Sequence, residues 1–371
     1  MNIRESVLKY EEKAVFGLRS LYRRYGYLPY KMSKFEEYDL YVRNKDFLVS
    51  DHIITFTDTD GKLLALKPDV TLSIIKNSKD SKGVQKLCYN ENVYRVTKGA
   101  QSFRELMQVG LECIGDIDDY SIYEVIMLAA ESLAMISENY VLDISHMGIL
   151  SAVIDSLGVT DDDKKAILKC VGEKNIHGIS SLLDAKNIDA TQLKKLMSLY
   201  GAPDKVLCEL SQICEKVDFK DELASLEKIV NLLKKNGFTD SIRIDFSVVN
   251  DMSYYNGFVF KGFIESVSAG VLSGGQYDKL MNKMGRSAKA IGFAVYLDML
   301  ERLDNTDGKY DVDAIVLYDE NSDLSALSDT VKLLSENGKT VMVQRELPND
   351  IRYKQLLKLN ERGVEILENN A

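Results

Sequence analysis

The chain has 371 residues, of which 45% are apolar and 28% are charged, an ordinary composition for a protein that buries a sizeable core in two or three domains. Its formal net charge of −10 argues against broad contact with a nucleic-acid backbone. The three histidines, at positions 52, 146 and 177, lack ligand spacing, so we expect no metal site and no cofactor.

The N-terminal third predicts helices that alternate with strands. Apolar residues at helical spacing predict a helix over 5–25 that ends at Gly26, and Asp60-Gly61 predicts the turn of a hairpin over 52–66. The elements expected next are a short helix over 70–78, strands over 86–96 and 103–115, a helix over 118–136 and a strand over 140–148.

Residues 149–240 change to short helices separated by Gly, Asn and Asp, with no fixed period, and this pattern predicts a helical insertion. Strand patterns return at 241–249 and 257–265, and residues 289–303 fit either a strand leading into a helix or a buried helical run. We therefore expect residues 1–308 to form an α+β domain with a large antiparallel sheet.

The C-terminal tail follows a polar segment over 304–311 that is typical of a linker. It predicts strand, helix, strand, helix, strand, with the second helix over 350–363. This order predicts a small α/β domain with parallel strands over 309–371.

One predicted strand carries an unusual polar face. In RELMQVGLECIG, Gln108, Gly110 and Glu112 share one face and apolar residues share the other. The polar face could look at water, as in many antiparallel sheets. Alternatively, Gly110 leaves room for a small polar ligand that Gln108 and Glu112 bind.

The five cysteines occur without a CxxC pair, and neither a signal peptide nor an apolar run of about 18 residues is evident. We therefore expect a cytoplasmic protein without a membrane partner.

Five motifs in order resemble the histidyl-tRNA synthetase family of class II synthetases. They are LKPDVT (66–71), LCYNENVYRV (87–96), RELMQVGLECIG (104–115), SYYNGFVF (253–260) and SGGQYDKL (273–280). The chain is more similar to the family's non-synthetase branch, the regulatory subunits of ATP phosphoribosyltransferase. The resemblance implies a class II synthetase-like antiparallel sheet with flanking helices, a helical insertion and a truncated anticodon-binding-like domain.

The resemblance also implies a histidine pocket made of hydrogen-bond acceptors, which suit an ammonium and an imidazole. By position, Asp69, with its hydroxyl partner Thr71, and Gln108 would meet the α-amino group, and Glu112 and Tyr255 the imidazole. Each residue has a plainer explanation, since an Asp after Pro often marks a turn and a Tyr pair often packs in a core. The implied ligand-binding set is Asp69, Thr71, Arg95, Arg104, Gln108, Glu112, Tyr254, Tyr255 and Tyr277.

Departures from the synthetase pattern argue against catalysis. Thr97 replaces an acidic residue. Asn250-Asp251 replaces an Arg-Gly pair, whose Arg in the family pairs with the carboxylate of the bound histidine and with the phosphate. Tyr296 and Met299 stand where a Gly and an Arg are expected, which fills the nucleotide slot and removes a phosphate clamp. In the dimer motif, Ser33 replaces Pro, with Pro29 four residues earlier. The short C-terminal domain and the acidic charge argue against a tRNA role.

The function implied is that of a non-catalytic regulatory subunit. It would assemble with the short-form catalytic subunit of ATP phosphoribosyltransferase, be required for its activity and carry histidine feedback inhibition, as a homodimer within a hetero-oligomer. The alternatives are a divergent histidyl-tRNA synthetase and a free-standing histidine-binding paralogue. The site of the effector histidine, in this pocket or at a subunit interface, stays open.

Overall fold

The computed structural model describes residues 8–48, 52–78, 83–96, 102–249, 255–300, 310–360 and 363–370. The chain divides into two compact units, Met1–Arg302 and Leu303–Ala371, each of which is described by itself. The predicted linker at 304–311 and the predicted boundary after residue 308 lie almost entirely in 301–309, outside the described residues, so the position of that boundary stays a prediction.

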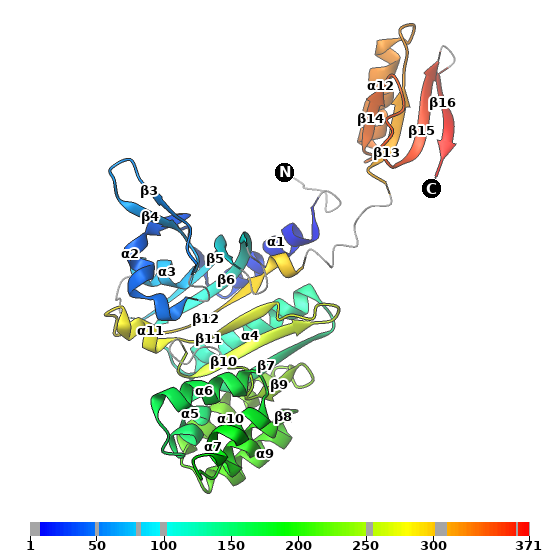
Figure 1. Ribbon diagram of the computed structural model, residues 1–371. Coiled ribbons are helices and arrows are strands. Elements are labelled where there is room, and N and C mark those ends of the chain that lie inside the picture. Colours follow the sequence, from blue (N-terminus) through cyan, green and yellow to red (C-terminus); the bar gives the residue numbers. More distant parts are fainter. Residues whose placement is uncertain are drawn as a thin grey trace. The chain divides into compact units, whose positions relative to one another are not determined.

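A nine-stranded sheet, counted over the described residues, forms the centre of the first unit (Figure 1). In spatial order its strands are β1 (Leu28–Pro29), β5 (Val84–Val96), β6 (Phe103–Gly115), β12 (Lys289–Tyr296), β11 (Leu272–Gln276), β10 (Phe258–Ile264), β7 (Tyr140–His146), β9 (Ile242–Asp245) and β8 (Tyr200–Gly201). In this spatial order, every pair of neighbouring strands between β5 and β7 is antiparallel, as predicted. The sheet is mixed, however, because β1 is parallel to β5 and β7 is parallel to β9.

Two helices cover one face of this sheet, α1 (Tyr10–Arg24) and α4 (Asp119–Ile136). Tyr22 of α1 packs edge-on against Phe293 of β12 at 5.9 Å, and Leu133 of α4 lies against Gly262 of β10. The predicted stop of the first helix is confirmed at Gly26, whose φ of +83° suits glycine. Because these helices bury one face, the opposite face is left for a site.

The first unit also contains a smaller three-stranded sheet, with strand order β2 (Phe35–Glu37), β4 (Leu63–Leu66) and β3 (Thr55–Thr57). The predicted hairpin is confirmed, since β3 and β4 pair antiparallel around Asp60-Gly61. Helix α2 (Tyr38–Arg43) packs on this sheet, and α3 (Thr71–Asn77) follows β4 as expected. The junction between β4 and α3 carries part of the site.

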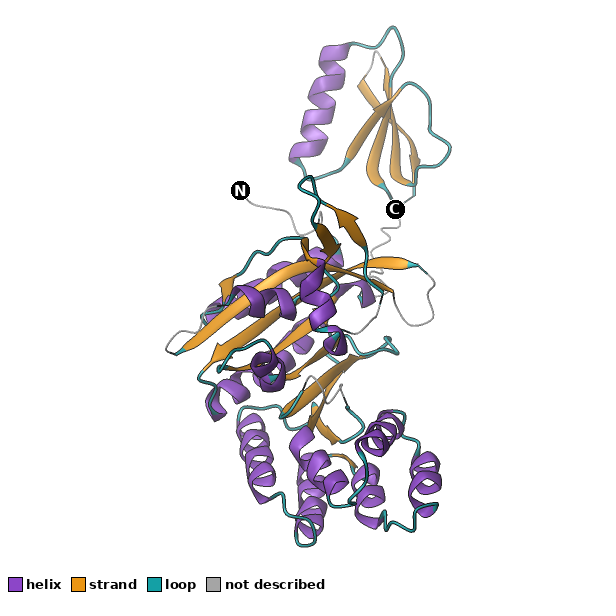
Figure 2. Cartoon of the chain, turned by 60° about the vertical axis from the view of Figure 1, so that its left-hand side comes forward, coloured by secondary structure: helices purple, strands orange, loops and turns teal. Residues whose placement is uncertain are grey.

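The chain from β7 to β9 is mostly helical. In Figure 1 its helices gather next to β8 and β9, and Figure 2 shows the same cluster from another side. They are α5 (Met147–Asp155), α6 (Asp161–Gly172), α7 (Ile176–Asp184), α8 (Thr191–Ser198), α9 (Pro203–Cys214) and α10 (Lys220–Lys235). After β11 come α11 (Asp278–Lys283) and β12, and β12 leads into a short 3-10 helix, Leu297–Met299, which confirms the strand-to-helix alternative.

The second unit corrects one prediction. Its sheet has the order β14 (Val341–Gln344), β13 (Val312–Leu317), β15 (Tyr353–Asn360) and β16 (Gly363–Asn369), with α12 (Leu324–Glu336) packed against it. The helix predicted over 350–363 is therefore wrong, since β15 occupies most of that range. The strands are not all parallel either, because β15 and β16 form an antiparallel pair. As a strand beside β13, this segment places Leu357 and Leu359 in a core cluster with Leu327 of α12, and burying these side chains outweighs the helical spacing of the local sequence.

Candidate functional site

A cavity of about 420 Å³ opens on the sheet face that α1 and α4 leave uncovered, a size suited to a small molecule. Strands β5, β6, β11 and β12 form its floor, and the β4–α3 junction forms one wall. Its lining residues are Phe47, Leu48, Asp69, Val70, Thr71, Tyr89, Arg95, Gln108, Glu112, Val249, Tyr255, Ser273, Tyr277, Gly292, Phe293, Ala294 and Tyr296.

Gln108 and Glu112 of β6 both point into this cavity. Their exposed fractions are only 6% and 2%, so the alternative in which this face looks at bulk water is wrong. The alternation itself is confirmed, since Val109 and Leu111 are buried on the other face, where α1 contacts β6. A buried amide and carboxyl on a cavity floor require hydrogen-bonding partners.

Two hydroxyl groups donate hydrogen bonds to the carboxyl of Glu112, one to each oxygen. Thr71 donates its hydroxyl to Oε1 at 3.1 Å, and Tyr277 donates its hydroxyl to Oε2 at 2.5 Å. Burial raises the pKa of Glu112 to about 8, and the negative charge of Asp69 adds to the rise, while the two hydroxyl donors oppose it. Without a positive charge beside it, the carboxyl is therefore largely protonated at neutral pH.

Asp69 and Thr71 come from the turn that starts α3. The carboxylate of Asp69 accepts a hydrogen bond from the backbone N–H of Leu72 at 2.9 Å, as a residue at a helix start does. Burial raises the pKa of Asp69, and the Leu72 N–H and the positive charge of Arg95 oppose that rise. The turn predicted by the plainer explanation is thus present, and the same side chain also lines the cavity.

Glycines let the cavity's side chains approach the sheet closely. A Cβ at Gly292 would collide with Glu112, and a Cβ at Gly275 would lie 2.6 Å from the ring of Tyr255. The expected space above Gly110 is occupied by the protein itself. The hydroxyl of Tyr89, the register partner of Gly110 on β5, lies there. The prediction that Gly110 leaves that space to a ligand is therefore wrong, and the cavity begins beyond the Tyr89 ring.

Arg95 and Tyr296 meet at one end of the cavity. The guanidinium carbon lies 6.0 Å from the centre of the Tyr296 ring, and the Tyr296 hydroxyl shares a 2.7 Å hydrogen bond with Ser273. Arg104 pairs with Arg95 across β5 and β6, but its side chain is exposed and it is not among the described lining residues. Its role stays a prediction.

Several predicted positions lie outside the described residues, namely Thr97, Asn250, Asp251 and Tyr254. Of the nine predicted ligand-binding residues, the structure brings seven to the cavity, Asp69, Thr71, Arg95, Gln108, Glu112, Tyr255 and Tyr277. Sequence reasoning missed Tyr89, Ser273 and Gly292. The glycine pair at 274–275 is a sequence signal next to Ser273, whereas the pairing of Tyr89 with Gly110 depends on the strand register, which only the structure shows.

Hydrogen-bond acceptors dominate the cavity, with two carboxyl groups, an amide and several phenols. Arg95 is the one cationic side chain among the described lining residues. This set favours a ligand rich in N–H donors, such as an amine or an imidazole. Over the described residues, no cluster of His, Cys, Asp and Glu could hold a metal ion, and no helix is long and apolar enough to cross a membrane.

Comparison with known proteins first defines the fold. The solved structure of an ATP phosphoribosyltransferase regulatory subunit/histidyl-tRNA synthetase from Bacillus halodurans matches with a TM-score of 0.74 and 25% identity, over 92% of this chain and 91% of that one. A chain of the ATP phosphoribosyl transferase (HisG:HisZ) complex from Thermotoga maritima matches in fold, with a TM-score of 0.62, 21% identity and coverage of 77% and 97%. The fold is that of a class II synthetase of the histidyl type.

Two sequence comparisons define the family. The family model described as histidyl-tRNA synthetase matches residues 3–300. A protein from Alkaliphilus metalliredigens named ATP phosphoribosyltransferase regulatory subunit is 30% identical over 287 residues, covering 75% of this chain and 72% of the relative. The chain therefore belongs to the histidyl-tRNA synthetase family, and within it to the ATP phosphoribosyltransferase regulatory subunits.

Proposed function

We propose that this chain is a non-catalytic, cytoplasmic subunit that activates the short-form catalytic subunit of ATP phosphoribosyltransferase and makes it sensitive to histidine. The buried Glu112 carboxyl, with Thr71 and Tyr277 on its two oxygens, carries this proposal. A ligand that brings a positive charge or an N–H donor stabilises the ionised form of a carboxyl whose pKa is about 8, and an imidazole brings both.

Feedback inhibition requires that histidine bind one state of the assembled enzyme more tightly than another. In this proposal the cavity is the effector site. Asp69 and Gln108 receive the α-amino group, and Glu112 and Tyr255 receive the imidazole. The ammonium also stabilises ionised Asp69, whose pKa burial raises.

The part of the cavity where Arg95 and Tyr296 meet supports a regulatory role over adenylation. Tyr296 extends into the cavity, and its ring lies beside Arg95, the cation that would otherwise be available to a phosphate. The hydroxyl of Tyr296 is bound to Ser273, which fixes the ring there. Catalysis of phosphoryl chemistry needs preorganised positive charge, and an aromatic ring at this point supplies none.

The test is the rate of the short-form catalytic subunit alone, with this chain, and with this chain plus histidine. We expect activation by the chain and inhibition by histidine. The double variant Glu112→Gln/Tyr255→Phe should activate normally but respond weakly to histidine, and Lys76→Met, a surface change on α3 outside the cavity, should behave like the wild type. Absence of both activation and association would refute the proposal, and histidine-dependent ATP–pyrophosphate exchange would then favour a divergent synthetase.

A further inference from the structure

Lys67 is a fully buried lysine next to the proposed site. It follows β4 directly, and its side chain is 0% exposed. Its Nζ lies 2.8 Å from Oε2 of Glu91 on β5, and the Glu91 side chain is 15% exposed. Burying such a pair carries a desolvation penalty that its mutual attraction does not always offset, so the pair is weak evidence for stability alone.

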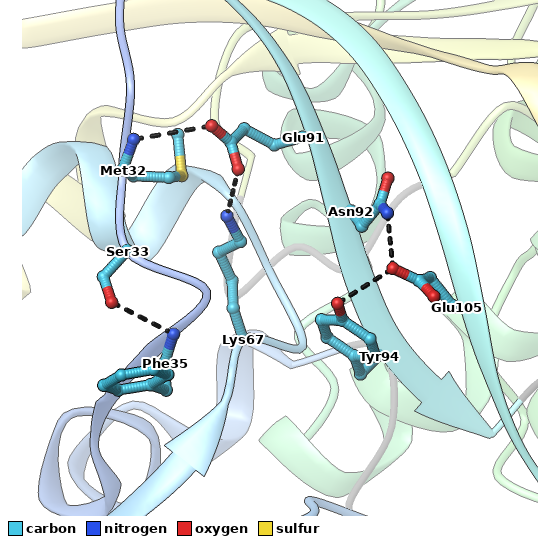
Figure 3. A network of polar contacts seen from close by, with 8 residues as sticks. All are labelled: Met32, Ser33, Phe35, Lys67, Glu91, Asn92, Tyr94 and Glu105. Atoms are coloured by element: carbon cyan, nitrogen blue, oxygen red, sulfur yellow. Dashed lines mark hydrogen bonds and ion pairs between the residues drawn. The ribbon is translucent and has the colours of Figure 1, made fainter.

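The contacts of Lys67 and Glu91 join three segments of the chain (Figure 3). The other carboxylate oxygen of Glu91 accepts a hydrogen bond from the backbone N–H of Met32 at 3.4 Å. The backbone of Lys67 is bound on both sides, because its N–H donates to Lys34 at 3.0 Å and its C=O accepts from Tyr94 at 2.9 Å. Both the main chain and the side chain at position 67 are therefore fixed.

The site residues start two positions later. Pro68 restricts the backbone between Lys67 and Asp69, and Thr71 begins α3. A fixed Lys67 therefore limits where the Asp69 carboxylate can lie. The positive charge of Lys67 also acts with Arg95 and the backbone donors against the burial that raises the pKa of Asp69, so it favours the ionised carboxylate.

We propose that Lys67 is a positioning residue for the amino-group side of the histidine pocket, with Glu91 as its anchor, acting through the placement and charge of Asp69. This inference rests on the proposed function. It assigns to the Lys67–Glu91 pair a selective effect on ligands that carry an ammonium. A pair that only supports the fold would affect every ligand of the cavity alike.

The test is titration calorimetry with two probes, L-histidine and 3-(imidazol-4-yl)propionate, which is histidine without its α-amino group. Lys67→Met should weaken histidine binding by about tenfold, the equivalent of one charge-assisted contact, and leave the affinity for the des-amino probe unchanged. Lys67→Arg should retain most of the histidine affinity, because it keeps the charge at that position. Lys76→Met is the matched control, since Lys76 also forms a 2.7 Å pair with a glutamate, Glu36, away from the turn.

Circular dichroism and thermal unfolding of each variant report whether the fold is intact. If Lys67→Met does not fold because Glu91 is left unpaired, Lys67→Met/Glu91→Gln removes both charges and should show the same selective loss. Equal weakening of both probes, or unchanged histidine affinity, would overturn the positioning role. A wild-type chain that binds neither probe would instead overturn the histidine pocket itself.

Discussion

Replacing Glu112 by glutamine tests the electrostatics of the pocket directly. Folding raises the pKa of Glu112 from 4.5 to about 8, so between these values the unfolded chain has released a proton that the folded chain still binds. The free energy of unfolding therefore falls as the pH rises through this window, and below it the carboxyl is neutral in both states. At about 1.4 kcal/mol per pH unit, the loss reaches at most ~5 kcal/mol by pH 8.

Glu112→Gln lacks this titration, so its unfolding free energy should be flatter between pH 5 and 8. At low pH the variant should be less stable by about 1 kcal/mol, because one hydrogen bond to Thr71 or Tyr277 is weakened. Above pH 8 it should be the more stable chain. Urea unfolding at successive pH values, with the wild-type curve subtracted, measures the difference.

Glu105→Gln provides the matched control on the same strand. Its carboxylate is exposed and accepts hydrogen bonds from Asn92 and Tyr94, which lower its pKa. Stability from a lowered pKa is present above 4.5 and is lost below it, so this variant should parallel the wild type between pH 5 and 8. Parallel curves for Glu112→Gln as well would refute the reasoning about the pocket.

Two further substitutions follow from the same geometry, and a third tests a buried carboxyl on β7. Gly292→Ala places a methyl group against Glu112 and the β6 backbone, so we expect the free energy of unfolding, measured with denaturant, to fall by about 1–3 kcal/mol. Histidine binding, measured by titration calorimetry, should also be weaker. Tyr277→Phe removes a donor that lowers the pKa of Glu112, so the pH window of falling stability should extend upward, as pH-dependent unfolding would reveal. Burial and the charge of Asp245 raise the pKa of Asp143 to about 6. The free energy of unfolding of the wild type should therefore fall by up to ~3 kcal/mol between pH 4 and 6, and Asp143→Asn should abolish this fall in the same assay.

Local patterns were sufficient where the periodicity was unambiguous. The alternation around Gln108 and Glu112 correctly predicted a strand with one polar face, because the side-chain period of a strand is strictly two. Asp60-Gly61 correctly predicted a hairpin, because a backbone φ of +85° suits glycine. These features depend only on residues close together in the chain.

Features that depend on distant pairing could not be predicted. Leu356, Leu357 and Leu359 fit a helix as well as a strand, and pairing with β13 decides between them. The space above Gly110 is occupied because the register of β5 brings Tyr89 opposite it, and a one-residue slip would turn Tyr89 to the other face. The candidate residues were thus visible in the sequence, but the boundary of the cavity was not.

The parallel pairing of β7 with β9 has a consequence for the order of folding. Leu142 pairs with Ile242, and all six helices from α5 to α10 lie between these two strands. Closing such a loop costs less entropy when the intervening chain is already compact. We therefore expect the β7–β9–β8 edge to assemble late, after the helical segment has collapsed, and contacts so distant in sequence slow the folding of a chain. A circular permutant opened within that segment would have to join this edge from two separate chain ends.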